Sequence, residues 1–169
     1  SKILLSTTAL VGLVAMTSTP SYATDDFATP TGGQVMGGSA SFSNPSTGLL
    51  NVTQHTDRAV INWDSFNVGT KAKTEFFQPN TQSLAVNRVT GNNANPTQIL
   101  GTLKSNGRLM ILDQNGVFFG KNSRVDVGGI IASTGDVDTN AVMRGDAKLD
   151  LTGFGNGSIV NEGMITLAD

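Results

Sequence analysis

The residues best suited to catalysis or metal binding are few in this chain of 169 residues. There is no cysteine, which excludes thiol nucleophiles, zinc–thiolate sites and disulfides. The only histidine, His55, has Gln54, Thr56 and Asp57 as neighbours, and this spacing does not make a metal site. We therefore interpret His55 as a surface-loop residue. No Gly-x-Ser-x-Gly elbow is present to hold a serine nucleophile.

Carboxylates offer a second kind of chemistry. Their spacing along the sequence matches neither a calcium-binding loop nor the repeat of calcium-binding solenoids. We therefore interpret these carboxylates as solvated turn residues. No two of them stand out as an acid–base pair, although β-helices that act on polysaccharides keep that alternative open. We expect no enzymatic activity, no metal and no cofactor. The acids concerned are Asp126, Asp136, Asp138, Asp146 and Asp150.

Arg88 is the charged residue with the most unusual neighbours, because it lies in the apolar-flanked run Val86-Asn87-Arg88-Val89. Strand periodicity puts Asn87 and Val89 on one face, and Val86 and Arg88 on the other. Two interpretations stay open, an ion-paired or solvated charge and a contact for a binding partner. The aromatic side chains of Trp63 and of the Phe pairs at 76–77 and 118–119 are assigned to core packing rather than to sugar stacking.

Composition limits the function classes. The net charge is −2 and no basic block is present, so we expect no nucleic-acid partner. Charged residues make up 14% of the chain, and there are 20 glycines. This composition is typical of a turn-rich β protein.

Residues 1–23 have the pattern of a secretory signal peptide. Lys2 provides a positive start, an apolar stretch follows to Met16, and small residues stand at Ser21 and Ala23. We expect cleavage after Ala23, so that a single mature domain covers residues 24–169.

The mature chain consists of short apolar runs closed by Gly, Asn or Asp. No amphipathic helical pattern lasts three turns, and the runs have the length and β-branched content of strands. Their close spacing favours a parallel β-helix with coils of roughly 20 residues over an antiparallel sandwich. Stacked Asn amides would join its corners. The runs cover residues 59–63, 83–86, 108–112, 116–119, 124–127, 129–132, 157–160 and 164–166.

The corner at Asn115-Gly116 is expected to need positive φ, and the runs 109–112 and 117–119 on either side of it are both expected to face the solenoid core. The chain stops at Asp169 directly after a strand. An uncapped solenoid end exposes a pairing edge, so we expect further coils in the natural protein.

The run Ile61-Asn62-Trp63-Asp64-Ser65-Phe66-Asn67-Val68-Gly69 resembles a motif of the secretion domain of filamentous haemagglutinins and high-molecular-weight adhesins, the exoproteins of two-partner secretion systems. The similarity continues in order through residues 77–80, 85–91, 99–103, 106–120 and 125–134. Two family turns differ here. Asn-Pro-Asn-Gly becomes residues 113–116, Asp-Gln-Asn-Gly, and Asn-Pro-Asn-Leu becomes residues 78–81, Gln-Pro-Asn-Thr. Both keep an Asn able to adopt positive φ.

The resemblance implies a right-handed parallel β-helix capped near its start by non-helical strands. It also implies export through the periplasm of a Gram-negative bacterium to the medium or cell surface. The partner would be an outer-membrane β-barrel transporter with periplasmic polypeptide-binding domains. Regions downstream would bind receptors on host or neighbouring cells. The candidate residues for transporter recognition or for key turns are Pro79, Asn80, Asn87, Arg88, Asn115 and Gly116. A stand-alone carbohydrate- or receptor-binding β domain is the alternative.

Overall fold

The structure is a computed structural model that describes residues 23–167. The expected signal peptide therefore lies outside the described residues, except for Ala23, and its cleavage stays a prediction. Within the described part, no helix has the length and apolar character needed to cross a membrane.

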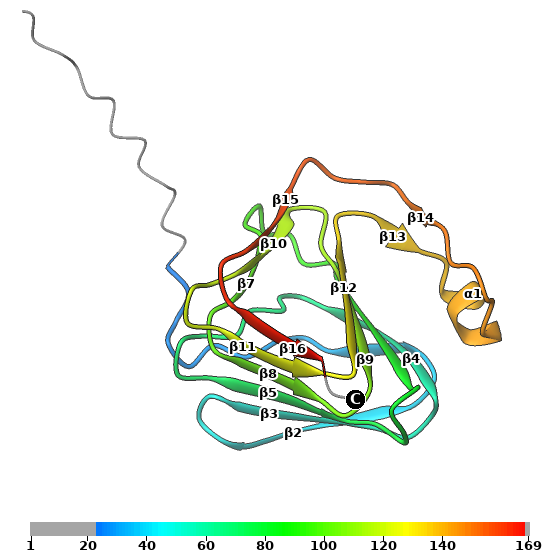
Figure 1. Cartoon of the computed structure of the whole chain (residues 1–169), viewed down its shortest axis with the longest axis horizontal. Helices are drawn as coiled ribbons and strands as arrows, with labels where there is room; N and C mark the ends of the chain where they lie inside the picture. Colours follow the sequence, from blue (N-terminus) through cyan, green and yellow to red (C-terminus); the bar gives the residue numbers. More distant parts are fainter. Residues whose placement is uncertain (1–22, 168–169) are drawn as a thin grey trace, which may run out of the picture.

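The chain winds through three parallel sheets that enclose one core, as Figure 1 shows. The first sheet contains the strands β4 (Arg58–Trp63), β6 (Leu84–Val89), β9 (Arg108–Leu112) and β12 (Gly129–Ser133). The second contains β7 (Thr97–Ile99), β10 (Gly116–Phe119) and β15 (Ser158–Asn161). The third contains β3 (Leu49–Gln54), β5 (Lys73–Phe77), β8 (Thr102–Ser105), β11 (Arg124–Val127) and β16 (Met164–Leu167). Each coil contributes a strand to the sheets in turn, and the predicted β-helix is confirmed.

The N-terminal end of the solenoid is closed by strands that do not belong to the coils. Strand β1 (Gln34–Gly37) pairs antiparallel with β4, and β2 (Ala40–Ser46) pairs antiparallel with β3. These strands occupy edges that would otherwise pair with another chain. The expected cap of non-helical strands is thereby confirmed.

The interior is built from alternate residues of each strand. Ala59, Ala85 and Leu109 are in register on three neighbouring strands of the first sheet, and all are buried in the main core. Trp63 and Phe66 are also buried there, with ring centroids 5.7 Å apart. Burying such side chains stabilises a fold by about 1.5–3 kcal/mol each, so stacked apolar rows can hold a chain that has no disulfide.

A second apolar cluster lies outside the solenoid, on the outer face of the first sheet. Val60, Val86 and Met110 are in register there, and Leu112 joins them. The prediction for residues 109–112 was therefore wrong for half of the run, because only Leu109 and Ile111 face the solenoid core. Strand periodicity sends their neighbours to the opposite face. Residues 117–119 alternate in the same way, and Val117 and Phe119 are the two in the core.

The outer cluster is covered by residues 134–157, which we call the strap. It leaves the solenoid after β12 and returns at β15 (Figure 1). It holds β13 (Asp136–Val137), α1 (Thr139–Arg144) and β14 (Leu151–Thr152). The Asp138 carboxylate accepts from the Ala141 N–H at 2.7 Å and caps the helix, which ends at Gly145 with a φ of 75°.

Side-chain amides join successive coils at the corner between the third and first sheets. The Gln78 Nε2 donates to Gln54 Oε1 at 3.0 Å, and the Gln78 Oε1 accepts from the Ser105 hydroxyl. All three side chains are buried. The expected stacking of amides is present, with glutamines and a serine in the buried ladder and with Asn106 bonded to the Gln78 backbone beside it. Because buried polar groups must be paired, this ladder fixes the register of three coils.

Candidate functional site

Pro79 and Asn80 lie on an exposed turn at the corner between β5 and β6. The Asn80 Oδ1 accepts from the Gln82 N–H at 2.9 Å, and the Asn80 Nδ2 donates to Asp57 Oδ1, also at 2.9 Å. Asn80 therefore shapes its own turn and ties it to the corner of the preceding coil. No described residue other than glycine has positive φ, so Asn80 does not use its ability to adopt that conformation. The side-chain hydrogen bonds close the turn instead.

The turn at residues 113–116 is held by a buried carboxylate. The Asp113 Oδ2 accepts from the Thr97 N–H at 3.0 Å and from the Thr97 hydroxyl at 2.8 Å. Its Oδ1 accepts from the Asn115 N–H at 2.9 Å. The Asn115 Nδ2 donates to Asn93 O at 2.7 Å and so anchors the loop before β7. The sequence analysis quoted Asp113 only as a departure from the family turn and missed this role.

Gly116 is the residue of this corner that needs positive φ. Its φ is 102°, whereas Asn115 has an ordinary negative value, which corrects the expectation for Asn115. A Cβ at Gly116 would also overlap the backbone of Ser158 in the next coil. The predicted strained corner is therefore present, at Gly116 alone.

Asn87 is not on a turn, because it lies within β6 and is fully buried. The Trp63 Nε1–H donates to Asn87 Oδ1 at 3.0 Å, and the Asn87 Nδ2 donates to Met110 O at 3.4 Å. The amide thus satisfies the one polar group of the large core tryptophan. In the folded domain Asn87 is out of reach of any partner.

Arg88 points the other way, as its strand periodicity predicts, and holds the strap. Its Nε donates to Asp136 Oδ1 at 2.6 Å and its Nη2 to Val137 O at 2.8 Å, both in β13. Its Nη1 donates to Asn62 Oδ1 at 3.1 Å in the neighbouring strand β4. The side chain is only 15% exposed. The structure therefore shows an ion-paired arginine; a contact with a partner stays a proposal.

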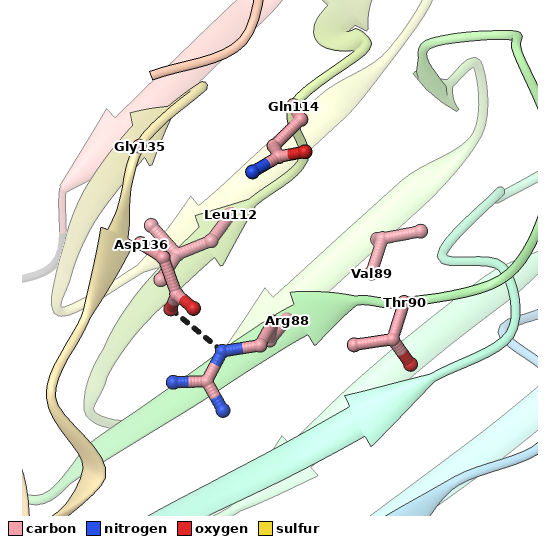
Figure 2. Close-up of a pocket in the computed structure, with 7 residues that line it drawn as sticks. All are labelled: Arg88, Val89, Thr90, Leu112, Gln114, Gly135 and Asp136. Carbon is pink, nitrogen blue, oxygen red and sulfur yellow. Dashed lines mark hydrogen bonds and ion pairs between the residues drawn. The ribbon is translucent and has the colours of Figure 1, made fainter. Parts of the chain in front are cut away.

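Arg88 and Asp136 lie at a shallow pocket on the outer face of the first sheet, shown in Figure 2. Gln114 lines the same pocket, and its Nε2 donates to Gly153 O of the strap at 3.1 Å. The structure thus brings Arg88 close to the turn at residues 113–116. Pro79 and Asn80 lie at a different corner of the solenoid.

The chemistry available at this pocket is limited to polar contacts. Its one carboxylate, Asp136, already accepts from Arg88 and from the Val137 N–H. Across residues 23–167, no three His, Cys, Asp or Glu side chains gather as metal ligands would. His55 is exposed, with its Nε2 3.1 Å from the Ser41 hydroxyl, and the surface-loop interpretation is confirmed.

Among the described residues, the titratable groups with shifted pKa values belong to exposed ion pairs. The hydrogen bond from Lys71, 2.8 Å from Asp26, lowers the pKa of the Asp26 carboxyl and raises the pKa of Lys71. Within the strap, the hydrogen bond from Arg144 lowers the pKa of Asp146. Neither pair lies at the pocket, so these shifts reflect surface ion pairing rather than a tuned reactive group.

Fold and site together define a short parallel β-helix with an antiparallel cap and with corners fixed by side-chain amides. The model of the TPS secretion domain family matches residues 26–168, and the chain belongs to this family.

Relatives and a solved structure agree with that assignment. The chain is 33% identical over 132 residues to a heme/hemopexin-binding protein of Haemophilus influenzae, covering 76% of this chain and 14% of that protein. The same protein from strain ATCC 51907 / DSM 11121 / KW20 / Rd is 33% identical over 137 residues, covering 80% and 15%. The crystal structure of the HMW1 secretion domain from Haemophilus influenzae has a TM-score of 0.72 and 29% identity, covering 82% of this chain and 36% of that chain. The chain thus spans about a seventh of the curated relatives' length.

Proposed function

We propose that this chain is the export-directing, fold-nucleating N-terminal domain of a longer exoprotein. An outer-membrane β-barrel transporter with periplasmic polypeptide-binding domains recognises it and passes it from the periplasm to the surface of a Gram-negative cell. The observation that carries the proposal is the match to the TPS secretion domain over nearly the whole described solenoid. The same proposal includes a large adhesin-like region that follows this domain in the longer exoprotein.

The solenoid gives export a physical mechanism. Each coil pairs in parallel with the one before it, as β4, β6, β9 and β12 do in the first sheet. A chain that leaves a pore from its N-terminus can therefore add coils one at a time on a completed template. The cap strands β1 and β2 come first in the chain and cover the starting edges. Folding outside the pore would then oppose backward movement of the chain.

Surface exposure divides the candidate recognition residues into two groups. Pro79 and Asn80 are exposed on their turn, and the transporter can contact them in the folded domain. Asn87 and Arg88 are enclosed by the core and the strap. They contact the transporter only in an unfolded chain, so we assign recognition of folded coils to the turn at Pro79.

A stand-alone sugar-binding domain is the less favoured function. Trp63, Phe76 and Phe119 are buried, as the core assignment predicts. The assignment was wrong for Phe77, which is exposed because it alternates with Phe76 along β5. Within residues 23–167, the exposed aromatic rings come from four separate segments and share no single strand, so they do not form a stacking platform. These are Phe27, Phe42, Phe77 and Phe154.

Secretion assays on turn variants test the proposal. The double variant Pro79→Ala/Asn80→Ala should lower secreted yield through the transporter several-fold, while the thermal melting temperature of the purified protein falls only slightly because the lost Asn80 hydrogen bonds are exposed. The matched control is Asn122→Ala, which removes an exposed asparagine from a turn at another corner. Equal secretion of the double variant, the control and the parent would show that the Pro79 turn is not the recognition element.

A further inference from the structure

The strap contacts parts of the domain that precede it by many residues. Helix α1 packs against β4 and against the cap strand β1. Met143 of the helix lies over Gly37, leaving no room for a Cβ there. Val137 and Val142 are buried against the outer row of Val60, Val86 and Met110. The strap therefore joins the cap to the first three coils from outside.

The strap has little structure of its own to hold it in place. Its helix has 6 residues, and β13 and β14 have 2 residues each and pair only with each other. Helices shorter than about 12 residues and isolated two-stranded ribbons are marginal in water. The strap consequently depends on the completed outer face of the first sheet for its order.

Arg88 is the polar anchor of that docking. It is the only described residue whose guanidinium bonds both to the strap, at Asp136 and Val137, and to the neighbouring coil, at Asn62. The Thr139 hydroxyl at the start of α1 accepts from the same guanidinium at 3.4 Å. A largely enclosed arginine with this many partners leaves an unpaired charge if one partner departs. The contacts therefore favour one docked position of the strap.

We propose that the strap is a latch that docks after the coils have formed and then slows their unfolding, with Arg88 as the residue that positions it. The order follows from the contacts, since the docking surface needs β1, β4, β6 and β9 in place. Interactions that form after the folding transition state affect the unfolding rate and leave the folding rate nearly unchanged. The inference concerns the folded chain alone and does not depend on recognition by a transporter.

Folding kinetics of the purified chain test the latch. Arg88→Met and Asp136→Asn should each raise the unfolding rate about tenfold, since the first removes every hydrogen bond of the guanidinium and the second removes the negative charge that neutralises it. Folding rates should stay within about twofold of the parent. The double variant should unfold little faster than either single variant, because the two changes remove one interaction. Arg144→Gln is the matched control, because it breaks an exposed ion pair within the strap, with Asp146, and should change neither rate.

Hydrogen exchange separates a latch from a general loss of stability. In Arg88→Met and Asp136→Asn, amides of residues 134–152 should lose protection while those of β6 and β9 keep it. Two results would overturn the inference. One is an unfolding rate equal to that of Arg144→Gln, and the other is a slowed folding rate with unchanged unfolding, which would put the strap in the folding nucleus. Asp136→Asn preserves side-chain shape and decides the matter if Arg88→Met does not fold.

Discussion

Replacing Gly116 by valine tests whether the corner between the first and second sheets has the proposed geometry. A β-branched residue at a φ of 102° costs about 1–3 kcal/mol in backbone strain. The new Cβ also overlaps the Ser158 backbone, so β15 must move away from β10, with which it pairs from Ser158 to Asn161. Each ladder hydrogen bond lost costs about 0.5–1.5 kcal/mol net. We expect a total loss of about 3 kcal/mol, a large share of the ~5–15 kcal/mol that stabilises a typical domain.

The assay is urea unfolding of the purified variant, followed by circular dichroism, together with secreted yield through the transporter. Ser123→Ala is the control, because Ser123 is a buried residue of the next turn and its Oγ has no hydrogen-bond partner among the described residues. Gly116→Val should lower the urea midpoint of unfolding and leave product in the periplasm. Ser123→Ala should be secreted like the parent, with a midpoint equal to or slightly above that of the parent, because it removes only a buried hydroxyl without a partner. An unchanged midpoint for Gly116→Val would refute the strained corner and the register of β10 against β15.

Three further outcomes are expected. Thr74→Val should stabilise the domain by about 1 kcal/mol in urea unfolding, because the buried Thr74 Oγ1 has no partner within residues 23–167; a loss of stability would count against this. Asn87→Leu should destabilise it by about 1–3 kcal/mol by leaving Trp63 Nε1 unpaired, and an unshifted midpoint would mean that the indole finds another acceptor. The melting temperature should fall slightly below about pH 4, because Asp26 and Asp146 have lowered pKa values and their stabilising charges are lost as pH falls through those values. Lys71 has a raised pKa, so its stabilising charge is lost as pH rises above about 10.5 and through that raised value. Asp26→Asn should weaken the fall in melting temperature at both low and high pH. An unchanged pH response in that variant would show that other groups cause the fall.

The strands that sequence patterns predicted best are those with local apolar runs. The run at residues 108–112 became β9, and those at 124–127 and 129–132 became β11 and most of β12. Short spacing and glycine corners were enough to favour a solenoid, because a strand of this length can bury its apolar face only by stacking on its neighbours. The resemblance supplied the cap, whose strand β2 is mostly polar and exposed.

The strap was missed, and the buried residues of the corner ladder were not identified, because their stability comes from contacts distant in sequence. Asp138 and Gly145 are sequence signals for the ends of α1, yet a six-residue helix leaves no periodic pattern between them. The alternation of side chains along a strand could have shown that Met110 and Leu112 face outward. A further segment of the chain must therefore cover these two apolar side chains. Nothing local indicates that Asp136 pairs with Arg88, since this contact exists only once the first sheet has formed.

A reporter fusion tests directly whether this chain directs export through an outer-membrane transporter. The chain is fused to a reporter protein and produced in a Gram-negative host with, or without, a transporter of the two-partner class. We expect reporter in the medium or on the cell surface only when the transporter is present, with the reporter confined to the periplasm otherwise. Periplasmic retention in both strains, or equal release from both, would contradict it.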